Sequence, residues 1–178
     1  EKLKILEIGA FKGSSTAAFH NYFKNSSIYA VDREKKIFNY KSNRIKFFKL
    51  DYMNRKQVKK FTNKFSNYFD IIIDDGGHFK SHILHNIKNF FKCLRNNSFY
   101  IIEDYGLKFD YLNDKLYEPN IFSILKKLSE KKNFKSQIIS KKYQNFIISK
   151  VDRINSYTGD WVRSEKNISD ICFIKTKK

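Results

Sequence analysis

Short apolar runs alternate with amphipathic stretches over the first 104 residues of the chain. This alternation is typical of a parallel sheet whose strands are joined by helices that cover both faces. The clearest helix is predicted at Ser81–Leu94, where apolar side chains recur at helical spacing on one face. The pattern predicts an α/β fold with five strands, at Lys4–Ile8, Ile28–Val31, Ile45–Leu50, Phe69–Ile73 and Phe99–Ile102.

The alternation stops after Asp104, where an aromatic-rich segment leads to a predicted helix at Ile121–Ser129. Stretches rich in β-branched and aromatic residues predict further strands at Ser136–Ser140, Phe146–Val151 and Ile171–Thr176. The last two have no long helix between them, so we expect them to pair antiparallel at the edge of the sheet. The connection 152–170 is long for a hairpin loop, and long loops are usually functional or mobile.

The length of 178 residues and a hydrophobic content of 41% predict one domain spanning residues 1–178. The chain opens with Glu1, and its first strand begins at residue 4, so we expect an N-terminal segment to be missing from this sequence. No apolar run approaches the roughly 20 residues that cross a bilayer, and no signal peptide is recognisable. We therefore expect a soluble, cytoplasmic protein.

Two further features of composition bear on partners. Cys93 and Cys172 each lie in an apolar run, which favours buried, reduced thiols over a disulfide. The formal charge of +18 would ordinarily suggest a polyanionic partner. The positive residues are mostly Lys, scattered among many Asn, Ile, Phe and Tyr, a mixture typical of genome-wide codon bias. We interpret the charge mainly as a solvated surface that binds nucleic acid only non-specifically.

The first strand runs into a glycine turn and then a helix, for which Ser14 or Ser15 is the expected N-cap. Gly9 and Gly13 let the backbone approach a ligand, while the helix N-terminus offers free amides to an anion. Position 11 is Phe, so the second glycine of the dinucleotide motif G-x-G-x-x-G is absent. A tight turn without any ligand remains the alternative.

Acidic residues follow the next two strands. Asp32 ends the second strand, where a carboxylate can accept hydrogen bonds from a ribose diol. Asp51 ends the third strand, where a carboxylate can accept one from an exocyclic adenine amine. Together with the glycine turn, these positions predict a nucleoside in the crevice at the carboxyl ends of the strands.

Four carboxylates are expected to converge at the ends of the fourth and fifth strands: Asp74, Asp75, Glu103 and Asp104. They would repel one another strongly unless a cation lies among them or some are protonated. Hard oxygen ligands favour Mg²⁺, Mn²⁺ or Ca²⁺ over zinc. Zinc held by His78, His82 and His85 is the weaker alternative, because no nearby Cys completes a tetrahedral set. A further alternative is that two of these acids only cap helices or are solvated.

The motif Glu7-x-Gly9-x-x-x-Gly13 with Asp32 and Asp51 resembles the class I S-adenosylmethionine (SAM)-dependent methyltransferases. The run Asp74-Asp75-Gly76-Gly77-His78, followed by Glu103-Asp104, looks like the Mg-dependent macrolide sugar O-methyltransferases of the macrocin and mycinamicin type and the cephalosporin hydroxylase-like proteins. The resemblance covers residues 3–104 well and the remainder only by strand pattern. That family's motif usually has Ser where this chain has Gly77.

The resemblance implies a Rossmann-like sheet with strand order 3-2-1-4-5-7-6 and residue roles that we state as expectations. The cofactor SAM would be bound by Glu7, Gly9, Gly13, Asp32, Asp51 and Asp74. A hard divalent cation such as Mg²⁺ would be held by Asp75, Glu103 and Asp104, with His78 as the general base. Aromatic residues between 105 and 117 would wall the acceptor pocket.

The expected activity is O-methylation of a small-molecule hydroxyl, such as that of a sugar or glycoside. We also allow for a homo-oligomer, and we expect no membrane partner. A hydroxylase-like or non-catalytic relative would keep the same residues. A nucleic-acid methyltransferase would exploit the positive charge, but the Asn-Pro-Pro-Tyr type of motif is absent and Pro119 is the only proline.

Overall fold

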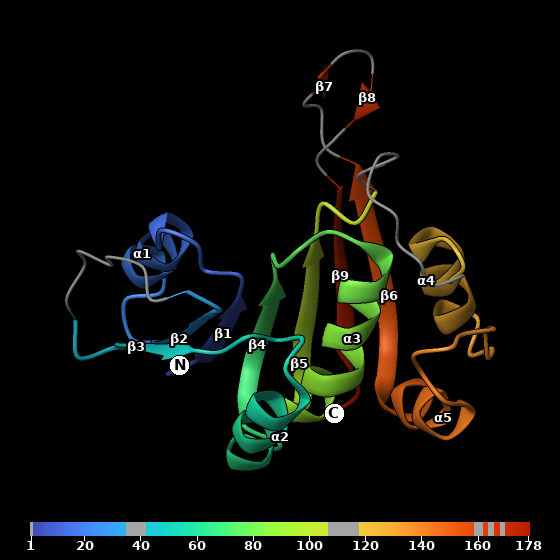
Figure 1. Cartoon of the computed structure of the whole chain (residues 1–178), viewed down its shortest axis with the longest axis horizontal. Coiled ribbons are helices and arrows are strands. Elements are labelled where there is room, and N and C mark those ends of the chain that lie inside the picture. The colour runs from blue at the N-terminus through green and yellow to red at the C-terminus, as the bar shows by residue number, and fades with distance from the viewer. Residues whose placement is uncertain (1, 35–41, 107–117, 159–161, 164–165, 168–169) are drawn as a thin grey trace.

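A computed structural model of the chain describes residues 2–34, 42–106, 118–158, 162–163, 166–167 and 170–178. Its centre is a seven-stranded sheet with the order β3-β2-β1-β4-β5-β9-β6 (Figure 1). These strands are β1 (Lys4–Ile8), β2 (Ser27–Asp32), β3 (Ile45–Lys49), β4 (Phe69–Asp74), β5 (Leu94–Glu103), β6 (Val151–Thr158) and β9 (Asp170–Thr176). Counted within this sheet, β9 is the seventh strand, so the predicted fold class and strand order are confirmed.

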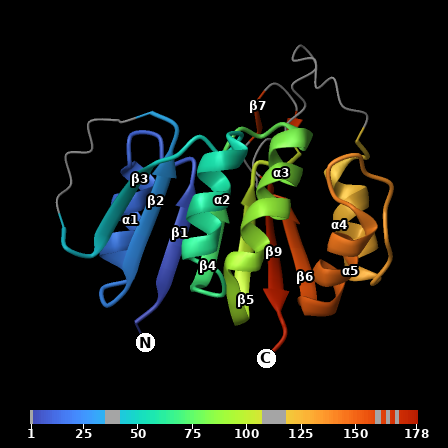
Figure 2. The same cartoon turned by 60° about the horizontal axis from the view of Figure 1, so that its bottom comes forward.

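The first five strands are parallel, whereas β9 runs antiparallel to both β5 and β6. Figure 2 shows β9 pointing toward the opposite end of the sheet from β1 and β2. Two short strands, β7 (Val162–Arg163) and β8 (Lys166–Asn167), pair with each other outside the main sheet. Because β1, β2, β4 and β5 are parallel, their carboxyl ends lie along one edge, and the strand order reverses between β1 and β4.

Helices pack on both faces of the sheet. One face carries α1 (Ser14–Tyr22), whose Phe19 packs with Ile5, Ile28 and Ile73 of the strands. The other face carries the larger core, which includes α2, α3, α4 and α5 (Figure 2). Their bounds are α2 (Arg55–Lys64), α3 (Lys80–Phe90), α4 (Ile121–Ser129) and α5 (Lys141–Lys150), with a 3₁₀ turn, η1 (Phe91–Cys93), after α3.

The interior is apolar, as a parallel sheet buried on two faces requires. Ile5, Leu6 and Ile8 of β1 are fully buried, and so is Ile72 of β4. Cys93 and Cys172 are buried free thiols, as predicted. None of the helices among the residues described here is both long and apolar enough to cross a bilayer.

Two strand predictions after residue 130 were wrong. Phe146–Val151 is mostly helix, because Tyr143, Phe146 and Ile147 recur at helical spacing against the core and Ser140 caps the N-terminus of α5. Ser136–Ser140 forms no strand. The Glu118 carboxylate instead accepts hydrogen bonds from the backbone amides of Gln137 and Ile138, at 2.7 and 3.1 Å. The predicted helix at Ile121–Ser129 and the strand near Ile171–Thr176 are confirmed.

Three boundaries also differ from the sequence prediction. The helix predicted at Ser81–Leu94 ends at Phe90, and Leu94 already begins β5. The expected antiparallel edge pair exists, but its outer strand is β6, so the supposed loop 152–170 is a strand as far as Thr158. The N-cap of α1 is Gly13, at φ 84°, rather than Ser14 or Ser15, because Ser15 donates its hydroxyl hydrogen bond to Glu7.

The β1 and β4 strands meet at their carboxyl ends through a backbone contact that leaves no room for a side chain. Gly9 has φ 90°, and a Cβ atom at this position would lie 2.2 Å from the carbonyl oxygen of Asp75. In turn, the Asp75 amide donates a 3.0 Å hydrogen bond to the carbonyl of Ile8. The glycine at position 9 therefore sets how closely the two loops approach.

We expect Gly9→Ala to lower the free energy of unfolding by about 3–5 kcal/mol, because left-handed strain adds to an overpacked backbone contact. Gly13→Ala is the control for the strain alone, since Gly13 also has a positive φ, and it should cost roughly 1–2 kcal/mol. Urea unfolding followed by circular dichroism measures both. Equal losses of unfolding free energy in the two variants would show that the close contact with Asp75 adds nothing to the cost of a side chain at position 9.

Candidate active site

The carboxyl ends of β4 and β5 bring together three side chains that could hold a cation. Ligand atoms of Asp75, His78 and Asp104 all lie within 4.8 Å of one another, and each residue is partly exposed. The Nε2 atom of His78 lies 3.8 Å from Oδ1 of Asp75. Asp75 follows β4 directly, Asp104 follows β5 directly, and His78 lies in the loop before α3. Their convergence thus follows from the parallel pairing of β4 with β5.

Glu103 lies beside this group without being part of it. It was expected to be a metal ligand with Asp75 and Asp104, whereas the compact group has His78 in its place. Glu103 is nevertheless close enough for its charge to interact with Asp75, Asp104 and Glu7. Its role as a ligand stays a prediction, as do those of the other two acids.

Burial and mutual repulsion raise the pKa values of these acids. The pKa of Asp75 rises to about 6, through burial first and then through the charges of Asp104 and Glu7. The pKa of Glu103 rises to about 7, again mainly through burial and then through its acidic neighbours, although His78 partly opposes the shift. The pKa of Asp104 is also raised by burial. A cation at this position would offset the repulsion among the ionised carboxylates.

Asp74, which was expected to contact the cofactor, is buried beneath the group. Asp74 is only 2% exposed. Its carboxylate accepts hydrogen bonds from Asn86 Nδ2 at 2.8 Å and from Tyr100 Oη at 2.9 Å. Burial raises the pKa of Asp74 to about 7 despite these bonds. The carboxylate therefore ties α3 and β5 to the end of β4, and the sequence pattern gave no indication of this use.

Glu7 and the glycine turn join β1 to α1. The Glu7 carboxylate is fully buried and accepts hydrogen bonds from the hydroxyls of Ser15 and Thr16 in the first turn of α1. Burial raises the pKa of Glu7, and the two hydroxyl bonds partly oppose that shift. Gly13 has φ 84° at the helix start. This arrangement directs the first turn of α1 toward the edge where the strands end.

Asp32 and Asp51 lie at neighbouring strand ends and support loops. Asp32 accepts hydrogen bonds from the amides of Phe11 at 2.9 Å and Glu34 at 3.0 Å, so it holds the glycine turn against the end of β2. Asp51 accepts one from the amide of Met53 at 2.9 Å. Each carboxylate oxygen can accept more than one hydrogen bond, so both groups keep capacity for a ligand.

Tyr52, which sequence reasoning missed, connects the loop after β3 with the loop that carries His78. Its hydroxyl accepts a 2.8 Å hydrogen bond from the Gly77 amide and lies 3.4 Å from Nδ1 of His82. A Cβ atom at Gly77 would lie 2.8 Å from that hydroxyl and 2.5 Å from Nδ1 of His82. Glycine at position 77 therefore makes room for Tyr52 and His82. The only signal in the sequence was the pair of adjacent glycines.

Asp170 is a second residue that the sequence did not indicate. Its carbonyl accepts a 2.7 Å hydrogen bond from the amide of Asp104, whose φ of 52° is in the left-handed region. Its carboxylate lies against Gly106, where a Cβ atom would be 1.8 Å from Oδ2. The antiparallel strand β9 thus fixes the position of Asp104 through its first residue.

The structure separates the three histidines that were considered for zinc. α3 begins at Lys80, so His78 lies outside the helix and does not share a helical face with His82. His82 packs edge-to-face against Tyr52 and Phe79. Across the part of the chain that the structure describes, the group of potential metal ligands contains His78 with two carboxylates and neither of the other histidines.

A family model, FtsJ-like methyltransferase, matches residues 1–156. The chain belongs to this family. A search of curated protein sequences found no significant match. The class I methyltransferase architecture expected from the sequence is therefore shown by both the strand order and the family match.

Solved structures with the same fold include several methyltransferases. The MycE methyltransferase of the mycinamycin biosynthetic pathway, solved with Mg, SAH and mycinamycin VI, has a TM-score of 0.69 and 18% identity over 100% of this chain and 46% of that chain. The CurJ carbon methyltransferase has a TM-score of 0.60 and 11% identity, with coverages of 100% and 49%. The Burkholderia thailandensis 1,6-didemethyltoxoflavin-N1-methyltransferase has a TM-score of 0.58 and 11% identity, with coverages of 100% and 72%. This FtsJ-like chain thus spans about half the length of the first two.

We expect the affinity of this FtsJ-like chain for Mn²⁺ to increase as the pH is raised from 5 to 8. Because the pKa values of Asp75 and Glu103 are raised to about 6 and about 7, protons compete with the cation below that range and are lost above it. Mn²⁺ titration followed by electron paramagnetic resonance measures the affinity. Asp75→Asn should weaken Mn²⁺ binding and reduce the increase, leaving only the part due to Glu103. An affinity independent of pH in the unaltered protein would contradict binding of the cation by these acids.

Tyr52→Phe should lower the free energy of unfolding by about 1–2 kcal/mol, because the partly buried amide of Gly77 loses its acceptor. The loop should also shift, which would move the imidazole signals of His78 in nuclear magnetic resonance spectra. Tyr68→Phe is the matched control, since its hydroxyl is 2.6 Å from that of Tyr29, away from this loop. Unchanged His78 signals in Tyr52→Phe would mean that Tyr52 does not position the loop.

Proposed function

We propose that this FtsJ-like methyltransferase transfers a methyl group from SAM to a hydroxyl of a small molecule with the help of a divalent cation. The observation that carries the proposal is the convergence of Asp75, His78 and Asp104 at the edge of the sheet. The same edge bears the glycine turn of β1, because Gly9 packs against the backbone of Asp75. A cofactor at the turn and an acceptor at the acidic group would therefore be neighbours.

Two features support a SAM site beside the glycine turn. Asp32 and Asp51 can each accept further hydrogen bonds, and the first turn of α1 is directed toward the same edge of the sheet. We infer that Asp32 accepts hydrogen bonds from the ribose hydroxyls and Asp51 from the adenine amine. Gly9 and Gly13 let the backbone approach the amino-acid part of SAM. Glu7 contributes indirectly: its carboxylate accepts hydrogen bonds from the hydroxyls of Ser15 and Thr16 and so holds the start of α1 in place. SAH is named in the MycE complex, which has the same fold.

The acidic group fits a hard divalent cation such as Mg²⁺, because two of its three members, Asp75 and Asp104, offer carboxylate oxygens. We assign Asp75 and Asp104 as its ligands and Glu103 as a further acid that completes the negative charge. When bound, such a cation lowers the pKa of a hydroxyl ligand and fixes its direction. Asp170 contributes indirectly, by holding the backbone of Asp104.

His78 is the general base in this proposal. It lies in the same group as the two carboxylates, and Asp75 is 3.8 Å from its Nε2 atom. A neutral imidazole there can take the proton of an acceptor hydroxyl held by the carboxylate group. Methyl transfer to the hydroxyl then needs mainly alignment of the nucleophile with the methyl carbon.

The charge around His78 favours an uncharged acceptor. Glu103, Asp104 and Asp170 all line or adjoin the edge, where the charge of Asp104 acts on both of the others. A polyanion such as nucleic acid would meet repulsion from these acids, even though the whole chain has a net charge of +18. The resemblance to macrolide sugar O-methyltransferases supports a glycoside or another diol. Most of the aromatic segment 105–117 expected to wall the acceptor lies outside the described residues.

Single-turnover methyl transfer to a panel of glycosides and other diols tests the proposal, with and without chelator. Chelation and Asp75→Ala should each abolish turnover while SAM binding, measured by calorimetry, is retained. His78→Ala should retain Mn²⁺ and SAM binding but lose roughly 10²- to 10⁴-fold in rate, the scale of general-base catalysis. His85→Ala is the matched control, because His85 is a partly buried histidine outside the acidic group.

Each part of the proposal can fail separately. Full activity in chelator would remove the cation from the reaction, and an unchanged rate in His78→Ala would leave that residue a structural histidine. Binding of SAM and Mn²⁺ without turnover across the panel would favour a hydroxylase-like or non-catalytic relative instead.

A further inference from the structure

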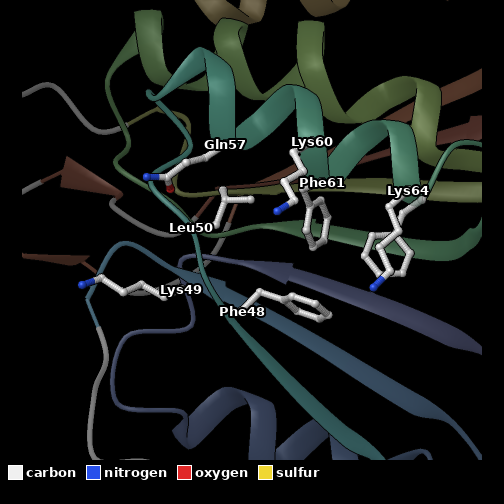
Figure 3. A pocket seen from close by; sticks show the side chains of 8 residues that line it. Phe48, Lys49, Leu50, Gln57, Lys60, Phe61 and Lys64 are labelled. Carbon is white, nitrogen blue, oxygen red and sulfur yellow. The ribbon is translucent and has the colours of Figure 1, made fainter.

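A groove lies between the edge strand β3 and helix α2. Its volume is about 350 Å³, which is within the usual range of small-molecule pockets. The walls are Phe48 and Leu50 from the strand side and Phe61 and Phe65 from the helix side. Figure 3 shows Phe48, Leu50 and Phe61 at the gap between the strand and the helix.

Lysine side chains surround this apolar interior. Lys60 and Lys64 lie one turn apart on α2, and Figure 3 shows both reaching down from the helix toward the gap, while Lys49 extends at the end near Gln57. None of the eight lining residues is acidic, and α2 contains no acidic residue at all. Like charges at this helical spacing repel one another. An anion between Lys60 and Lys64 would remove that repulsion.

The shape of the groove favours an elongated ligand. Its lining follows α2 from Gln57 to Phe65, which is roughly 12 Å of helix at 1.5 Å per residue. At one end, Oε1 of Gln57 accepts a 2.9 Å hydrogen bond from the amide of Asp51, and its remaining amide nitrogen is uncharged, unlike the ammonium groups of Lys60 and Lys64. The anionic group is thus expected toward Lys60 and Lys64, with an apolar body extending along the strand.

The burial of the apolar walls argues against larger partners. Leu50, Phe61 and Phe65 are only 3–6% exposed, so a flat bilayer surface would not reach them. Nucleic-acid bases stack on exposed ring faces, whereas Phe61 and Phe65 are buried and pack against Phe48 and Phe69. A second copy of this strongly positive chain would bring further positive charge to the lysines.

We propose that this groove binds a free acyl carboxylate. The acyl chain lies against Phe48, Leu50 and the rings of α2, and the carboxylate accepts hydrogen bonds from the ammonium groups of Lys60 and Lys64. None of its lining residues is assigned to the cofactor or the metal, although Gln57 adjoins the proposed cofactor site through its hydrogen bond with the amide of Asp51. The proposal does not depend on methyl transfer.

Decanoate, used below its micelle concentration, is the probe. In ¹H–¹⁵N spectra of the chain, it should shift the amide signals of Leu50, Phe61 and Phe65, and decanol and decyltrimethylammonium should bind more weakly. The double variant Lys60→Gln/Lys64→Gln should weaken decanoate binding about three- to tenfold, the effect expected when partly exposed ion pairs are lost. The matched control is Lys56→Gln/Lys59→Gln, which removes the same charge from the same helix outside the groove.

Equal weakening in the two double variants would overturn the proposal, because it would show attraction to the overall charge alone. Decanol binding as tightly as decanoate would also overturn it, by removing the role of the lysines. A third contrary result would be an absence of decanoate shifts together with shifts of the same amides by anionic vesicles or by a single-stranded oligonucleotide. Thermal unfolding of both variants should match that of the unaltered protein, which confirms that they fold.

Discussion

The close approach of the β1 and β4 backbones is the constraint on which the rest of the site depends. Gly9 lies directly against the carbonyl of Asp75, and the amide of Asp75 donates to the carbonyl of Ile8. This contact occurs at the strand where the order of the sheet reverses, which is where open α/β sheets bind ligands. It brings the glycine turn, the proposed cofactor-binding element, next to the loop that carries Asp75 and His78.

Several acids at this edge stabilise the fold through hydrogen bonds to other parts of the chain. Glu7 holds the first turn of α1, Asp32 holds the glycine turn, and Asp74 joins α3 to β5 from a buried position. Burying a carboxylate is costly unless its oxygens are hydrogen-bonded, and Glu7 and Asp74, the two buried ones, both are. Asp75, Glu103 and Asp104 instead act on one another through their charges, which adds to the effect of burial in raising the pKa values of Asp75 and Glu103. This difference separates a supporting set from the set we assign to chemistry.

The distribution of charge gives two regions of the molecule different ligand preferences. A chain with a net charge of +18 nevertheless brings Asp75, Glu103, Asp104 and Asp170 together at the ends of β4, β5 and β9, which favours a cation and a neutral acceptor there. The edge at β3 and α2 has lysines over an apolar groove instead, which favours an anionic amphiphile. The net charge of the whole chain therefore describes neither site.

The sequence by itself determined the parallel core, the strand order implied by the family resemblance, and the strand ends at which Asp32, Asp51, Asp75 and Asp104 lie. These follow from local patterns, because an apolar run of five residues followed by Gly or Asp marks both a buried strand and its end. The sequence misassigned 146–151 as a strand, because short apolar runs suit a helix and a strand equally until the core selects one. It also misassigned 136–140, which is held by hydrogen bonds to Glu118 instead of a sheet. Only the tertiary structure decided that His78 joins Asp75 and Asp104, that Tyr52 occupies the space beside Gly77, and that Asp170 holds Asp104. Each of these contacts joins residues from different elements, and no pattern along the chain records the distance between them.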